Sequence, residues 1–335
     1  MTGSDIRGAV YIPAQAYNAY QMWRDYDPAE ARRDLGYAQS LNLNALRVWL
    51  SYEYWLEAPD KLERAVNDFL SAAAEREIRV MPSLFECCGV DPTRSALDDR
   101  DPRTALCVCS PSRTVMRDRL HWQGPGEYIQ WFMSRFGNDP RLLAIEVINE
   151  PGGQTLHFGR AMFRRAAADR RNVPLTVGSI SLKHNLYFLD LGMDILQFHE
   201  NFPQKLEAFQ AGLNEALLTQ EVLERPVWLT EWQRLRPGGS GWGDAPIAGD
   251  EWQPGYATLA PAVRASGLGA FFWSLMIKPA YLPAQRRKGT LNGVFHEDGA
   301  VWSLEDARAI SGNPKFMAGE RREWPAWARA ASQSN

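Results

Sequence analysis

Short apolar runs alternate with amphipathic stretches along this chain. Eight runs have the length and composition of buried strands: residues 10–12, 45–50, 79–85, 143–148, 175–178, 195–198, 227–230 and 268–273. Between them, apolar residues recur at helical spacing in residues 28–38, 61–70, 126–136, 158–168, 204–218, 256–265 and 304–310. This alternation predicts successive βα units that build a parallel sheet.

The number of runs indicates the architecture. Eight strands, each followed by a helix, predict an α/β fold of one closed (β/α)8 TIM barrel. Because no linker, low-complexity tract or internal repeat interrupts the pattern, we expect a single domain over residues 1–335. Three long irregular segments, 86–112, 234–252 and 277–293, follow strands, so we expect them over the C-terminal face, where barrel enzymes place their sites.

Composition narrows the class of partner. Hydrophobic residues make up 45% and charged residues 23%, as in ordinary soluble enzymes. The formal net charge of -3 argues against a nucleic-acid binder, and no run is long enough to span a membrane. Residues 1–7 are polar and precede no long apolar segment, so we expect a cytoplasmic protein, and the charge balance favours a neutral small molecule as its partner.

Two of the apolar runs deliver a glutamate at their C-terminal end. The run 142–148 leads into Asn149, Glu150 and Pro151, and the run 227–230 leads into Glu231. Either Glu alone would more often cap a helix or face solvent. Two carboxyl groups facing one cleft, however, are the minimum needed to cleave a glycosidic bond with retention. We therefore predict that Glu150 and Glu231 are the catalytic pair.

Other strand ends carry polar and aromatic residues of one recognisable set. The chain resembles clan A glycoside hydrolases, most closely the cellulase-like family 5 enzymes, which have the acid/base in Asn-Glu-Pro on strand four and the nucleophile on strand seven. The family pattern is matched by Arg47 in Asn44-Ala45-Leu46-Arg47, by Asn149 before the acid/base, by His199 ending strand six and by Trp273 ending strand eight. The resemblance implies that these four residues belong to the substrate site.

Two positions depart from the family pattern. The family usually has a His near the end of strand three, whereas this chain reads Glu86-Cys87-Cys88. It also usually has a Tyr two places after the strand-six His, where this chain has Asn201. The departures indicate a divergent relative of family 5 or of a neighbouring family.

The two carboxyl groups are expected to differ in protonation. Glu231, near Arg47, should be the ionised nucleophile, while Glu150 on the more apolar strand should hold its proton longer and act as acid and then as base. Asn149 is placed to bond the sugar 2-hydroxyl, and Trp273 to form the floor of the sugar site.

Four of the predicted substrate-site residues have a second interpretation, and for Trp273 it is core filling. Arg47 is either a buried counter-ion for a strand-end carboxylate or a direct sugar contact. His199 is either a satisfied core imidazole or part of the site. Glu86 either binds a substrate hydroxyl or caps the next helix.

Four cysteines, Cys87, Cys88, Cys107 and Cys109, occur in one loop region. Their spacing fits neither of the usual zinc-site patterns. We therefore expect four free thiols, with a disulfide as the second interpretation and a metal site as the third. We expect no cofactor and no metal.

The sequence thus predicts a retaining β-glycosidase that acts on gluco- or manno-configured oligosaccharides. The alternatives are an inverting glycosidase of the same fold and a non-catalytic carbohydrate-binding barrel. A metal-dependent barrel hydrolase is a further reading, although none of the five histidines forms a His-x-His pair.

Overall fold

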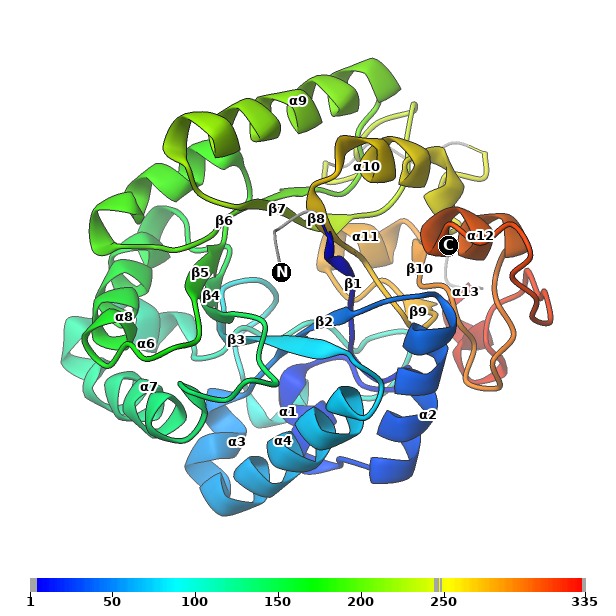
Figure 1. Ribbon diagram of the computed structural model, residues 1–335. Helices are drawn as coiled ribbons and strands as arrows, with labels where there is room; N and C mark the ends of the chain where they lie inside the picture. Colours follow the sequence, from blue (N-terminus) through cyan, green and yellow to red (C-terminus); the bar gives the residue numbers. More distant parts are fainter. Residues whose placement is uncertain (1–4, 244–246, 248, 333–335) are drawn as a thin grey trace.

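Eight strands form the centre of the molecule. The computed structural model describes residues 5–243, 247 and 249–332 (Figure 1). The strands are β1 (Arg7–Val10), β2 (Ala45–Trp49), β3 (Arg79–Glu86), β4 (Ile145–Asn149), β5 (Leu175–Gly178), β6 (Leu196–Glu200), β7 (Val227–Trp232) and β8 (Gly269–Phe272). They hydrogen-bond in the order β5-β4-β3-β2-β1-β8-β7-β6, and each neighbouring pair in that order is parallel.

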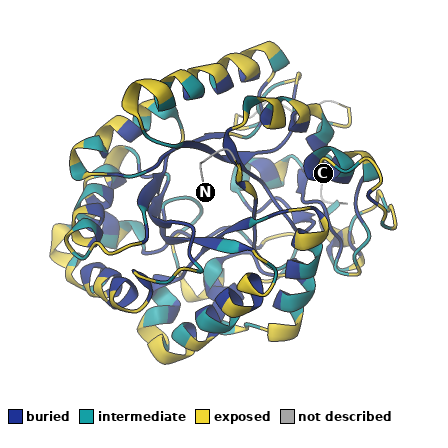
Figure 2. Ribbon diagram, in the orientation of Figure 1, coloured by how far each residue is buried: buried dark blue, intermediate teal, exposed yellow. Residues whose placement is uncertain are grey.

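The two edges of this sheet meet and close the barrel. Thr176 of β5 forms a parallel bridge with Ile195, and its Oγ1 donates to the Ile195 carbonyl at 2.8 Å. Helices surround the ring of strands in Figure 1, and Figure 2 shows buried strands inside helices whose outer faces are exposed. The predicted (β/α)8 barrel is confirmed.

The N-terminal end of the barrel is filled by apolar side chains. Ile6, Ala45 and Trp228, at or next to the starts of β1, β2 and β7, belong to one buried cluster with Phe271. Gly8 leaves room for this packing, because a Cβ at that position would lie 2.2 Å from the Phe271 ring.

Each predicted helical stretch overlaps an α-helix, and six further short α-helices of the described chain lie outside those stretches. The α-helices are α1 (Ala19–Arg24), α2 (Pro28–Ser40), α3 (Tyr52–Glu57), α4 (Pro59–Ala74), α5 (Arg94–Asp98), α6 (Arg113–Arg117), α7 (Gln123–Phe136), α8 (Leu156–Ala168), α9 (Leu206–Leu223), α10 (Ala260–Ser266), α11 (Pro283–Arg287), α12 (Leu304–Ser311) and α13 (Arg329–Ser332). The start of α2 shows the local cause: Asp27 accepts from the backbone N–H of Ala29, and Pro28 occupies the first turn. Among the described helices, none has the length and apolar character of a membrane span.

Several predicted elements need correction. β5 is followed by two 3-10 turns, Leu182–Tyr187 and Leu189–Leu191, and not by an α-helix. The first strand is Arg7–Val10 and not residues 10–12. The prediction missed its start because Arg7, Gly8 and Ala9 carry little apolar signal, although Gly8 and Ala9 pair with β2 and Arg7 pairs with β8.

Two of the predicted irregular segments contain regular structure. The segment 86–112 contains α5, and 277–293 contains α11 and a hairpin of β9 (Lys278–Pro279) and β10 (Leu291–Asn292). In the third, 234–252, residues 244–246 and 248 lie outside the described residues.

Candidate active site

A cavity of about 660 Å³ lies over the C-terminal ends of the strands. Its walls come from the ends of β3, β4, β6 and β7 and from the loops that follow β3, β5, β6, β7 and β8. Six of the seven predicted site residues line it: Glu86, Asn149, Glu150, His199, Glu231 and Trp273. The seventh, Arg47, lies behind the wall with its side chain fully buried.

The two predicted catalytic carboxyl groups meet in this cavity. One carboxylate oxygen of Glu150, one of Glu231 and a ring nitrogen of His199 all lie within 4.8 Å of one another. The strand register explains part of this arrangement, because His199 of β6 is paired with Glu231 of β7.

Glu231 is deeply set and held on both oxygens. Its side chain is 5% exposed. Arg47 Nη1 donates to Oε1 at 2.7 Å, and Asn201 Nδ2 donates to Oε2 at 3.0 Å. The amide that bonds this carboxylate, Asn201, stands at the position where the sequence departs from the family pattern. Two donors, one of them a permanent cation, fix the orientation of the Glu231 carboxyl group.

Glu150 is more accessible, with a side chain 25% exposed. His199 Nδ1 lies 2.6 Å from Oε1, and the Cys88 thiol donates to Oε2 at 2.9 Å. The backbone of Glu150 has a φ of 48°, in the left-handed region that few non-glycine residues adopt. Such a conformation costs on the order of 1 kcal/mol or more and clusters at functional sites, where the surrounding structure imposes it.

The expectation that Glu150 holds its proton longer is wrong for the substrate-free site. Burial by itself raises the pKa of this carboxyl, but the hydrogen bond and charge of His199, helped by Cys88 and Arg47, bring the pKa below its usual value. The apolar sequence around Glu150 predicts that the carboxyl is buried. It does not predict the neighbouring imidazole, because His199 belongs to β6.

Arg47 organises the polar interior of the barrel. Its Nε and Nη2 bond the two oxygens of Glu146 at 2.8 and 2.7 Å, and Nη2 also donates to Asn149 Oδ1 at 2.6 Å. A Cβ at Gly178 would lie 2.7 to 2.8 Å from Asn149, Arg47 and Glu146, so the network requires a glycine there. These contacts make Arg47 a counter-ion behind the site.

Glu86 faces the cavity and caps no helix. Its Oε1 accepts from the Cys88 backbone N–H at 2.6 Å, and Asn149 Nδ2 lies 3.1 and 3.0 Å from its two oxygens. The first turn of α5 is capped by Thr93 instead. Burial raises the pKa of Glu86 to about 8. A carboxyl that is neutral at pH 7 is able both to donate to and to accept from a hydroxyl.

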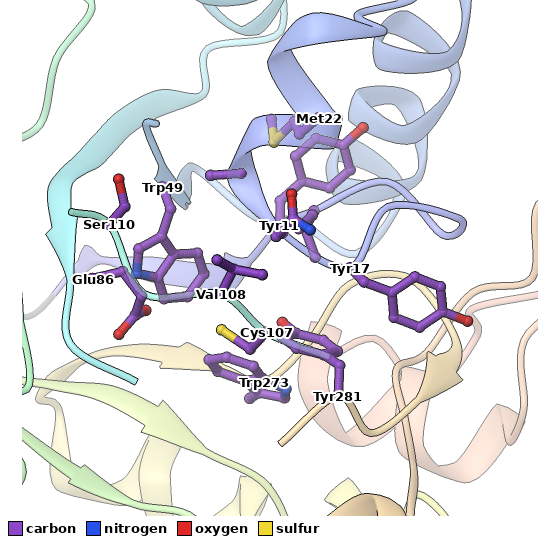
Figure 3. A pocket seen from close by; sticks show the side chains of 13 residues that line it. Tyr11, Tyr17, Met22, Trp49, Glu86, Cys107, Val108, Ser110, Trp273 and Tyr281 are labelled. Carbon is purple, nitrogen blue, oxygen red and sulfur yellow. The ribbon is translucent and has the colours of Figure 1, made fainter. Parts of the chain in front are cut away.

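Aromatic side chains form the floor next to the carboxyl groups. A hollow of about 20 Å³, room for one water, shares Glu86, Cys107 and Trp273 with the large cavity. Figure 3 shows the Cys107 sulfur between the rings of Trp49 and Trp273, with Tyr281 on the other side of Trp273. The rings of Trp273 and Tyr281 are 5.6 Å apart. Of these three rings, Trp273 also lines the large cavity, and an indole face suits the C–H face of a sugar.

The donor atoms of Glu150, His199 and Glu231 are close enough to raise the question of a metal. Two ligands of one tetrahedral Zn²⁺ stand about 3.3 Å apart. His199 Nδ1 and Glu150 Oε1 are separated by 2.6 Å, a hydrogen-bond length, and Arg47 already bonds Glu231 Oε1. These groups are already engaged in hydrogen bonds within the site, an arrangement that fits an acid/base pair better than a metal centre.

Sequence reasoning missed three residues of the site. Asn201 could have been found from the sequence, because it occupies the position where the resembled family usually has a Tyr. Glu146 also carried a signal, because a charge inside the apolar run 142–148 needs a buried cation such as Arg47. Cys88 carried none, since its contact with Glu150 depends on the path of the loop after β3. All four cysteines are free thiols.

Comparison with known proteins supports the fold. No protein-family model matches the chain, and no curated protein matches it in sequence. Among solved structures, it is similar to the exo-beta-1,4-mannosidase Op5Man5 from Opitutaceae bacterium strain TAV5, with a TM-score of 0.64 and 17% identity over 97% of this chain and 59% of that one. This chain therefore spans less than two thirds of the length of Op5Man5.

Two further structures are similar over most of both chains. GH5_18 from Streptomyces cattleya, solved in complex with GlcNAc, has a TM-score of 0.59 and 16% identity over 94% of this chain and 82% of that one. The endo-1,4-beta-D-mannanase from Thermotoga petrophila RKU-1, solved with maltose and glycerol, has a TM-score of 0.57 and 14% identity over 91% of this chain and 100% of that one. The chain therefore has the barrel fold of these glycoside hydrolases, and the resemblance to clan A enzymes is confirmed at the level of the fold.

Proposed function

We propose that this protein is a retaining β-glycosidase that acts on manno- or gluco-configured oligosaccharides. The observation that carries the proposal is the meeting of Glu150 and Glu231, oxygens within 4.8 Å, in one large cavity. Retaining enzymes place their carboxyl groups about 5 to 5.5 Å apart, and inverting enzymes about 6.5 to 9.5 Å apart. The manno configuration comes first because two of the similar structures are named a mannosidase and a mannanase.

The roles follow from the contacts of each carboxyl. Glu231, fixed by Arg47 and Asn201, attacks the anomeric carbon while Glu150 protonates the leaving oxygen. Glu150 then removes a proton from water, which hydrolyses the glycosyl ester on Glu231.

The proton for the first step comes from the pair formed by His199 and Glu150. When substrate displaces water from the cavity, the low dielectric favours the neutral pair, in which Glu150 carries the proton. Asn149 and Glu86 line the same wall and offer polar groups to the sugar hydroxyls.

A screen of aryl glycosides tests this proposal directly. We expect hydrolysis of an aryl β-mannoside or β-glucoside at neutral pH, no effect of a chelator, and a β-anomer as the first product seen by NMR. An α-anomer would identify an inverting enzyme, and loss of activity with EDTA a metal-dependent hydrolase. Binding of oligosaccharide without turnover of any glycoside would identify a carbohydrate-binding barrel.

A further inference from the structure

The thiol of Cys88 is hydrogen-bonded to the carboxyl group of Glu150. Its Sγ donates to Oε2 at 2.9 Å, while His199 Nδ1 bonds the other oxygen at 2.6 Å. The two oxygens of Glu150 are therefore held from opposite sides, by the loop after β3 and by β6. Both Cys88 and Glu150 line the large cavity.

The backbone around Cys88 is fixed. The N–H of Cys87 donates to the Asn149 carbonyl at 3.2 Å, and the N–H of Cys88 donates to Glu86 Oε1 at 2.6 Å. Gly89 has a φ of 93°, and a Cβ there would lie 2.2 Å from the Cys107 carbonyl oxygen. This turn therefore excludes side chains at position 89 and holds the Cys88 thiol in place.

We propose that Cys88 is a positioning residue for Glu150: its thiol fixes the orientation and the ionisation of the carboxyl that the proposed function makes the acid/base. The proposal depends on the proposed function only in naming Glu150 as the acid/base. Glu150 needs such support because its backbone is in the left-handed region and its side chain reaches into an open cavity.

Other groups around Glu150 come from four strands: Arg47 on β2, Glu86 on β3, His199 on β6 and Glu231 on β7. Burial, with Glu150 and Glu86 nearby, raises the pKa of Cys88 well above its usual value, so the sulfur keeps its proton and acts as a donor. A donor stabilises the carboxylate form of its partner. Loss of the thiol should therefore raise the pKa of Glu150.

The test measures the titration of Glu150 by NMR of its side-chain carboxyl carbon in ¹³C-glutamate-labelled protein, assigned by its absence in Glu150→Gln. In Cys88→Ala we expect the titration to move up by about one pH unit, the equivalent of one modest hydrogen bond. Cys88→Ser, which keeps a donor, should stay near the wild type. Cys109→Ala is the matched control, since that thiol bonds Asp91 in the same loop region.

A wild-type titration in Cys88→Ala, or an equal shift in Cys109→Ala, would overturn the proposal. The activity arm follows kcat/KM of an aryl glycoside against pH, where the basic limb should move upward in Cys88→Ala because the acid keeps its proton to higher pH. If no glycoside is hydrolysed but the NMR shift appears, the proposed function fails while the positioning contact stands. If the wild type is active and Cys88→Ala moves neither readout, only the positioning role fails.

Discussion

Glu150 and Glu231 stand at the same end of two strands of one barrel, yet their surroundings differ in almost every respect. Glu231 is 5% exposed and faces a permanent cation, Arg47, and an amide, Asn201. Glu150 is 25% exposed and faces a titratable imidazole and a thiol. One carboxyl is bonded to a permanent cation, whereas the other is bonded to an imidazole and a thiol, groups that carry protons of their own. These contacts are a stronger basis for assigning the nucleophile and the acid/base than the positions of the two residues on their strands.

The largest predicted effect is a difference in products between the two alanine variants. Glu231→Ala should lose at least about 10⁴-fold in kcat on every substrate, because no nucleophile remains. Glu150→Ala should lose far less in the first step on aryl glycosides with acidic phenols, which need no proton to depart.

Azide should then separate the roles. In Glu231→Ala it attacks the substrate itself and gives the α-glycosyl azide, whereas in Glu150→Ala it attacks the glycosyl enzyme and gives the β-glycosyl azide. NMR of the products distinguishes them, and Glu215→Ala on the exposed face of α9 is the control. The same azide from both variants would contradict the assignment.

Removal of the cation behind Glu231 comes next in size. Arg47→Met leaves Glu146 and Glu231 buried without a partner, and breaking a buried pair in this way costs about 3 to 5 kcal/mol in the free energy of unfolding. Denaturant titration measures the loss. Arg329→Met, which removes an exposed pair with Glu323, should change stability by about 0.5 kcal/mol or less. Equal losses in the two variants would show that Arg47 is not the counter-ion of the site.

Glu86, in the cavity wall beside Glu150, leads to a prediction about how the stability of the protein depends on pH. Because folding raises the pKa of Glu86 from 4.5 to about 8, the folded state binds the proton more tightly, and stability should fall as pH rises from about 4.5 to 8. The slope from this one group reaches at most about 1.4 kcal/mol per pH unit. Glu86→Gln, neutral at every pH, should equal the wild type near pH 4 and exceed it near pH 8. Glu215→Gln is the control, and parallel stability curves for Glu86→Gln and wild type would count against a buried neutral Glu86.

The sequence was most informative where the barrel repeats itself. Eight apolar runs predicted the strands, and the residues at their ends predicted six side chains of the cavity, because parallel strands bring their carboxyl ends to one edge. It failed where the backbone departs from that repeat. The 3-10 turns after β5, the β9–β10 hairpin and the contact of Cys88 with Glu150 all depend on loop paths that no periodicity encodes.

The protonation of Glu150 shows a second limit. Its apolar strand favoured a raised pKa, and that contribution is present, but His199 arrives from a strand almost fifty residues away in sequence, as its contact with Glu150 shows. Single-strand reasoning predicts burial well. It does not predict which titratable neighbours come from other strands.

The smallest predicted effect concerns the amide that bonds Glu231. Asn201→Ala removes one neutral donor from an ionised carboxylate, which typically contributes about 1.5 to 3 kcal/mol, so kcat should fall about tenfold to a hundredfold. Since Arg47 still holds the other oxygen, the basic limb of the pH profile, set by Glu150, should not move. Asn201→Asp, which places a like charge against Glu231, should be worse than alanine.

This pair of variants sharpens the contrast between the two carboxyl groups. A donor lost at Glu231 should reduce the rate without changing its pH dependence, and a donor lost at Glu150 should shift the pH dependence itself. Steady-state kinetics across pH on Asn201→Ala and Cys88→Ala measures both. If Asn201→Ala moves the basic limb as far as Cys88→Ala does, the two carboxyl groups titrate as one coupled pair and the separate roles assigned to them no longer hold.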